Sequence, residues 1–216
     1  MHFATAITKC PDVCDRDVYE DVSQQFRDVD PKLQAFLGAV ASISPYLTDL
    51  LRKEETWLRM WLDAGNITAP IEIEDSDDIG AALRRAKRRV ALWTALCDFA
   101  GVWQVEEVCA TLTNFADRAL QCAFNYAISQ QIARAKLPGL ARDAHPNDTG
   151  LFVLAMGKMG AGELNYSSDI DLICLFDEAR FSVDDFFEAR AALIKATRNA
   201  TALLNDITSD GYVFRT

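Results

Sequence analysis

The sequence lacks any long apolar run. Half of its 216 residues are hydrophobic, yet no stretch approaches the roughly 20 consecutive apolar residues that a membrane-spanning helix needs. Residues 1–10 also lack the basic start and apolar centre of a secretory signal. These absences predict a protein without a membrane partner, and we expect it to be cytoplasmic.

Positive charge is also in short supply. The chain has 22 Lys and Arg residues against 32 Asp and Glu residues, which gives a formal net charge of -10. Nucleic-acid-binding proteins ordinarily present a basic face, so no nucleic-acid partner is predicted. The length allows one or two domains with a substantial core.

A closed zinc site is missing from the cysteine pattern. Most of the six cysteines fall on apolar positions of helical or strand patterns, which is typical of reduced, buried thiols. Cys10 and Cys14 lie near His2, but no second ligand pair accompanies them. We therefore predict no zinc centre from these residues.

Helical patterns fill the first two thirds of the chain. Asp30 and Ser44 each precede a proline, a combination typical of a helix start with a capping side chain. Two apolar stripes, separated at Gly101, predict a long helical hairpin. We expect a mobile tail before a first helix that begins near Asp17, and a helical bundle over residues 1–145.

A basic cluster occupies the first helix of this hairpin. Its members are Arg84, Arg85, Lys87, Arg88 and Arg89. A run of like charges on a helix is usually a solvated face, which is the interpretation we favour. The alternative is a docking face for phosphate or for an acidic protein.

The stretch from Leu151 to Phe176 contains two predicted strands. The run Leu151–Met156 is continuously apolar and bounded by glycine, which predicts a strand buried on both faces. The second strand is predicted over Ile170–Phe176. The connection is too short for the crossover of a parallel pair, so we expect an antiparallel or strongly bent arrangement.

An acidic pair begins the second strand. Side chains alternate along a strand, so Asp169 and Asp171 share one face. Neighbouring carboxylates repel one another, and a divalent cation compensates for this repulsion. Mg²⁺ accepts a few carboxylate oxygens together with substrate phosphates. An ordinary turn before a solvated strand is the simpler interpretation, but the glycine turn and the serines beside the pair favour a catalytic site.

The glycine turn between the strands has a use at such a site. Gly157, Gly160 and Gly162 allow the backbone to approach a ligand closely, and Lys158 adds a point charge. Neither the P-loop pattern nor the dinucleotide-binding pattern fits the spacing of this turn.

The last part of the chain predicts one more helix and one more strand. Ser182 and Asp185 form a capping box for a helix that ends near Asn205. Residues 212–214 read Tyr-Val-Phe and predict a third strand. The fold class is therefore α+β, with an N-terminal helical bundle followed by a sheet domain over residues 146–216.

The segment GKMGAGELNYSSDIDLI, residues 157–173, resembles the signature of the glutamine synthetase adenylyltransferases, also called adenylyl-removing enzymes. Residues 44–47, 83–89 and 211–215 are similar to the N-terminal half of that family. The resemblance implies a nucleotidyltransferase-type mixed β-sheet with flanking helices, incomplete at its C-terminus. It also implies that this half of a bifunctional enzyme removes AMP from a tyrosine of glutamine synthetase with phosphate, yielding ADP.

The resemblance assigns roles to individual residues. Asp169 and Asp171 would bind Mg²⁺ and be catalytic, while Gly157, Lys158 and Gly160 would face nucleotide or phosphate. Ser168 would support the first aspartate and the phosphate site. A third carboxylate is implied directly after residue 216, so we expect residues 1–216 alone to be inactive.

The partners implied by the resemblance are glutamine synthetase, ATP, ADP, phosphate and, through regions absent from these residues, the PII signal protein. Two alternatives remain from other classes. One is a nucleotidyltransferase that acts on small molecules, which would not need the long helical preface. The other is a noncatalytic module that senses nucleotide.

Overall fold

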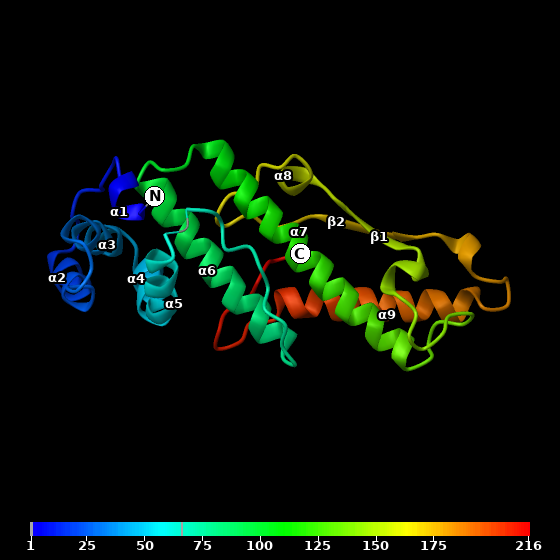
Figure 1. The fold of residues 1–216 in the computed structure, drawn as a ribbon. Helices are drawn as coiled ribbons and strands as arrows, with labels where there is room; N and C mark the ends of the chain where they lie inside the picture. Colours follow the sequence, from blue (N-terminus) through cyan, green and yellow to red (C-terminus); the bar gives the residue numbers. More distant parts are fainter. Residues whose placement is uncertain (1, 66) are drawn as a thin grey trace. The chain divides into compact units, whose positions relative to one another are not determined.

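The structure is a computed structural model and describes residues 2–65 and 67–216 (Figure 1). The α+β class is confirmed, because the described residues form several helices and one small antiparallel sheet. The main helices are α1 (Phe3–Ala6), α2 (Arg16–Gln25), α3 (Pro31–Ile43), α4 (Pro45–Lys53), α5 (Glu55–Asp63), α6 (Ile79–Phe99), α7 (Val105–Ala133), α8 (Gly157–Gly160) and α9 (Phe186–Asn205). The strands are β1 (Leu151–Ala155) and β2 (Leu172–Phe176). Within the described residues, no helix is both long enough and apolar enough to cross a bilayer.

The chain divides into two compact units. Unit 1 comprises residues 1–71 and 86–112, and unit 2 comprises residues 72–85 and 113–216. Both α6 and α7 therefore contribute residues to each unit. This division differs from the boundary between residues 145 and 146, which stays a prediction about functional domains.

Local capping signals place the helices of unit 1. Asp30 Oδ1 accepts the backbone N–H groups of Lys32 and Leu33, and Ser44 Oγ accepts that of Leu47. Each cap satisfies an amide that has no partner inside the helix. The predicted helix starts are confirmed, as is the turn between α6 and α7, where Gly101 has a φ of +65°.

Aromatic rings fill the core of unit 1. The centroid of the Phe3 ring lies 4.8 Å from that of Trp93 and 6.1 Å from that of Phe36. The ring centroids of Trp61 and Trp93 are 6.2 Å apart. The predicted mobile tail is therefore wrong. Phe3 and Ile7 are buried in this core, and burying two large apolar side chains offsets part of the entropy lost on ordering the segment.

The basic cluster is mostly a structural feature, and its interpretation as a solvated face is wrong. In unit 1, Glu54 is 5% exposed and accepts Arg88 Nε at 2.7 Å and Arg89 Nε at 3.1 Å. In unit 2, buried Arg84 donates to the carbonyls of Gly80, Asp206 and Gly211. A guanidinium can be buried when fixed acceptors replace the water molecules that hydrate it. The sequence pattern alone does not show these acceptors.

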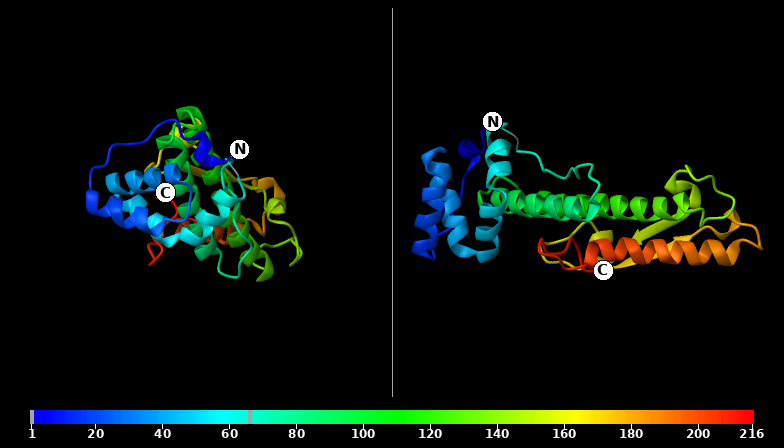
Figure 2. Two further views of the ribbon diagram at one scale, coloured as in Figure 1. Left: turned by 60° about the vertical axis from the view of Figure 1, so that its left-hand side comes forward. Right: turned by 90° about the horizontal axis from the view of Figure 1, so that it is seen from below.

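The sheet of unit 2 is an antiparallel pair, which confirms the predicted connection. Leu151 pairs with Phe176, and Ala155 pairs with Leu172. One face of the sheet is half-buried. On that side, the ring centroid of Phe176 lies 6.1 Å from that of Phe186 in α9. This helix runs beside the strands (Figure 2).

The other face of this sheet is open. Its large apolar side chains are 43% to 48% exposed, namely Phe152, Leu154, Met156, Ile173 and Leu175. The prediction that β1 is buried on both faces is therefore wrong for this structure, because no described element covers that side. The implied mixed sheet is also not found, since the described residues form two antiparallel strands.

The predicted third strand is wrong. Residues 212–216 have no strand conformation, although Val213 and Phe214 are buried. The backbone N–H groups of both residues donate to the carbonyl of Leu204 in the last turn of α9. A strand ladder would need those donors, so the helix end competes with the sheet for this segment.

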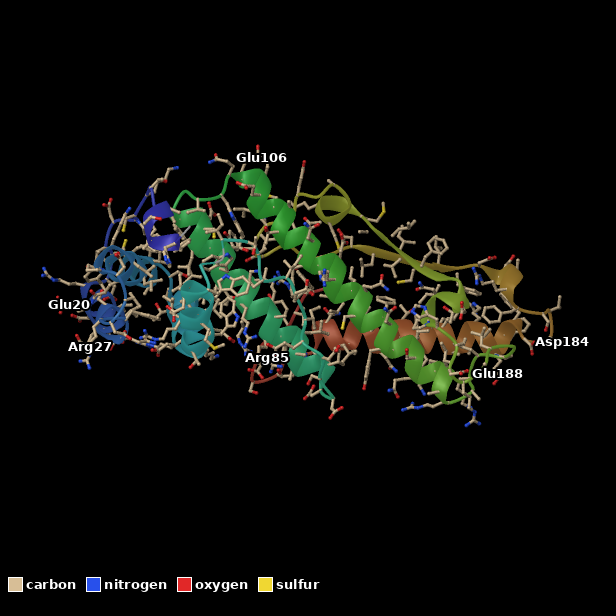
Figure 3. The ribbon with its side chains drawn as sticks, in the orientation of Figure 1. Glu20, Arg27, Arg85, Glu106, Asp184 and Glu188 are labelled. Atoms are coloured by element: carbon tan, nitrogen blue, oxygen red, sulfur yellow. The ribbon has the colours of Figure 1, made fainter. Side chains whose placement is uncertain are left out.

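Acidic side chains lie in the first turns of two long helices. Glu106 stands in the first turn of α7 and Glu188 in the first turn of α9 (Figure 3). Carboxylates at these positions interact favourably with the positive end of the helix dipole. The Ser182–Asp185 pair forms as predicted, with Oγ to Oδ2 at 2.7 Å, but it closes the turn just before α9.

Candidate active site

Asp171 stands immediately before β2, next to the glycine turn. Its carbonyl accepts the N–H of Met156 at 2.8 Å, which continues the ladder between the strands by one residue. Its carboxylate is close to the turn, because Oδ2 lies 3.2 Å from where a Cβ on Gly157 would stand. Gly157 has a φ of +55°, so glycine suits both the backbone conformation and the close approach.

Asp169 lies two residues earlier and is held by an arginine. Arg215 Nε lies 2.6 Å from Asp169 Oδ1, and both side chains are more than half exposed. Ile170, between the two aspartates, is buried and donates its N–H to the carbonyl of Arg215 at 2.9 Å. The alternation predicted from sequence is therefore present, with two exposed carboxylates flanking a buried isoleucine.

The other residues of the glycine turn differ in role. A Cβ on Gly160 would stand 2.4 Å from the carbonyl oxygen of Ala155, so packing of the turn against β1 already requires this glycine. Lys158 is exposed, in the short helix α8, and the turn has no side-chain cap. Contact of Gly157, Lys158 and Gly160 with phosphate stays a prediction.

Ser168 is engaged with the turn rather than with Asp169. Its Oγ donates to Asn165 Oδ1 at 2.8 Å and accepts the N–H of Asn165 at 3.1 Å. This small ring of hydrogen bonds fixes the chain just before the acidic pair. The structure therefore gives Ser168 a positioning role at Asn165, and a phosphate contact stays a prediction.

The donor set of the site suits a hard cation. Two exposed carboxylates, Asp169 and Asp171, are oxygen donors, and Mg²⁺ commonly takes its other ligands from water and substrate phosphates. Across residues 2–65 and 67–216, no group of three or more His, Cys, Asp or Glu side chains gathers into a metal cluster. A cation held by Asp169 and Asp171 stays a prediction.

Arg215 is the site residue that sequence reasoning missed. It belongs to the GYVFR run, but no local pattern relates that run to an aspartate more than 40 residues earlier. The ion pair occurs together with the backbone hydrogen bond between Ile170 and Arg215, and only the folded chain reveals either contact.

A separate groove of about 410 Å³ lies between α7 and β1. It is lined by polar and apolar side chains, including Asp117, Gln121, Phe124 and Phe152, and the acidic pair is not among them. Burial raises the pKa of the Asp117 carboxyl above its ordinary value. The groove contains none of the predicted site residues.

Comparison with known proteins agrees with the resemblance of the signature. Residues 34–216 match the family described as glutamate-ammonia ligase adenylyltransferase. Two similar relatives are named bifunctional glutamine synthetase adenylyltransferase/adenylyl-removing enzyme. The one from Rhodopseudomonas palustris is 38% identical over 198 residues, and the one from Bradyrhizobium diazoefficiens is 40% identical over 198 residues.

The match covers 86% and 87% of this chain, respectively, and 20% of each relative. By their names, these relatives are adenylyltransferases, and the matched region corresponds to one segment of each relative. The chain belongs to the glutamate-ammonia ligase adenylyltransferase family. It spans about a fifth of the length of the curated relatives it matches.

Proposed function

We propose that this chain contributes an acidic nucleotidyl-transfer site that acts on glutamine synthetase in the cytoplasm. The observation that carries the proposal is the placement of Asp169 and Asp171, both exposed at the start of β2, with the Asp171 carboxylate against the backbone of Gly157. A divalent cation bound by the two carboxylates would neutralise phosphate charge. The names of the relatives support glutamine synthetase as the protein substrate.

The finer proposal is that this site removes AMP. An oxygen of inorganic phosphate attacks the phosphorus that links AMP to a tyrosine of glutamine synthetase. The bond from phosphorus to the tyrosine oxygen breaks, that oxygen takes up a proton, and the AMP leaves as ADP. Asp169 and Asp171 orient the reacting phosphates, while the backbone at Gly157 leaves room for them to approach.

The test is Asp171→Asn in the full-length enzyme, assayed for both adenylylation and phosphate-dependent deadenylylation of glutamine synthetase. We expect a loss of at least about 100-fold in deadenylylation, because a lost cation contact removes several kcal/mol of transition-state stabilisation. Adenylylation should persist. The matched control is Asp177→Asn, which changes an exposed carboxylate at the other end of β2.

Three other outcomes separate the alternatives. Loss of adenylylation alone would reverse the proposed direction. Small, equal losses in both directions would remove the pair from catalysis. Nucleotide binding that depends on Asp171, without turnover in either direction that depends on it, would identify a sensing module.

A further inference from the structure

Arg215 is fixed beside the acidic pair by both its backbone and its side chain. Its carbonyl accepts the N–H of Ile170, and its Nε donates to Asp169 Oδ1 at 2.6 Å. The guanidinium carbon lies 6.0 Å from the centroid of the Tyr212 ring, within the range of a cation–π contact. The arginine is thus placed where a ligand of the two carboxylates would arrive.

The guanidinium keeps most of its capacity to bind a ligand. It carries five N–H donors in a rigid fork, and the bond to Asp169 uses the Nε edge. The side chain is 59% exposed, so a ligand from solvent can reach it. A planar fork of this kind matches two oxygens of a phosphate group better than the single contact it makes to the carboxylate.

We propose that Arg215 binds the phosphate of the substrate and, before the substrate arrives, substitutes for the cation at Asp169. The inference rests on the proposed function of the acidic pair. A cation on Asp169 weakens the attraction between that carboxylate and Arg215, because the two positive charges compete for the same oxygens. A phosphate between the cation and the guanidinium then satisfies both.

The chain provides a closely matched control in unit 1. Arg52 Nη2 lies 2.6 Å from Asp21 Oδ2, and the two side chains are 51% and 63% exposed. The corresponding exposures of Arg215 and Asp169 are 59% and 62%. The pairs share distance and exposure, but the pair in unit 1 joins two helices, α2 and α4, whereas Asp169 lies between the glycine turn and β2.

The test measures binding by calorimetry in the full-length enzyme, with Mg²⁺ alone and with ADP at saturating Mg²⁺. Arg215→Gln should weaken ADP binding at this site about tenfold or more, since hydrogen bonds to charged groups are the strong ones. It should leave Mg²⁺ binding unchanged or tighten it up to about fivefold, the range of an exposed ion pair. The ADP affinity of Arg215→Lys should lie between those of the wild type and Arg215→Gln. Arg52→Gln should change neither the Mg²⁺ affinity nor the ADP affinity.

Asp171→Asn defines the baseline for nucleotide that binds elsewhere in the enzyme. If Asp171→Asn loses ADP binding while Arg215→Gln binds like the wild type, the inference fails and the acidic site stands. If Arg215→Gln weakens Mg²⁺ and ADP equally, Arg215 only supports the fold, and the inference fails. If wild type and Asp171→Asn bind both ligands equally, the proposed function fails, and the inference fails with it.

Discussion

Glu54 of unit 1 and the acidic pair of unit 2 differ in how their negative charge is compensated. In unit 1, Glu54 is almost fully buried and has two guanidinium partners, Arg88 and Arg89. In unit 2, Asp169 and Asp171 are exposed, and Asp169 has one partner that solvent can reach. A buried carboxylate with fixed partners resists exchange, whereas an exposed one can exchange a side chain for a cation. The difference separates a charge that organises a fold from charges suited to a ligand.

Apolar surface shows the same contrast. In unit 1, the rings of Phe3, Phe36 and Trp93 are buried together. The sheet of unit 2 leaves one apolar face open beside the acidic pair. We therefore expect substitutions in unit 1 to act on stability, and substitutions around the sheet to act on binding.

The largest effect should come from the core of unit 1. Phe36→Ala should lower the free energy of unfolding by about 3–5 kcal/mol, because it removes a buried ring and leaves a cavity. Phe152→Ala is the counterpart in unit 2 and should cost less than about 1 kcal/mol, since that ring is 48% exposed. Urea denaturation measures both, and equal losses would contradict the contrast.

The free energy of unfolding should depend on pH through Lys87, a cation of unit 1. Burial lowers the pKa of Lys87 from 10.5 to about 8, so the unfolded chain binds its proton more tightly than the folded chain. Stability should therefore rise with pH between about 8 and 10.5, by up to about 3 kcal/mol from this group. Lys87→Met should abolish that rise, as denaturation across this pH range would show.

The next largest loss of stability should come from removing the buried carboxylate of Glu54. Glu54→Ala leaves the Arg88 and Arg89 guanidinium groups without their carboxylate, at a cost of about 2–3 kcal/mol. Asp21→Ala breaks only the exposed pair with Arg52 and should cost about 1 kcal/mol or less. Thermal unfolding of the two variants should differ clearly, and a similar shift for both would mean that burial does not strengthen the pairing.

The smallest effect should arise in the glycine turn of unit 2. Gly160→Ala forces the turn away from the Ala155 carbonyl and should cost about 1–2 kcal/mol. Hydrogen exchange should quicken around β1 and α8 and stay unchanged in α3. Gly139→Ala separates the two possible costs, because Gly139 has a positive φ of +78° while its added Cβ would meet nothing within 4 Å, so any loss of stability there comes from backbone strain.

Sequence reasoning succeeded where the determinants are local. Asp30 and Ser44 cap the residues that follow them, and burial alternates over Asp169, Ile170 and Asp171 as the sequence predicts. It failed where distant groups decide. Residues 212–214 have a strand-like pattern, but the carbonyl of Leu204 takes two of their amides. The contact of Arg215 with Asp169 likewise has no local signal.

The acceptors of Arg84 also bear on how the protein is made. Its guanidinium bonds to the carbonyls of Asp206 and Gly211, which follow it in the chain by 122 and 127 residues. A ribosome therefore produces this arginine long before two of its three carbonyl partners exist. The residues of unit 1 are complete once residue 112 has emerged, whereas unit 2 must wait for its last segment. Vectorial synthesis thus favours closure of the aromatic core before the acidic site is assembled.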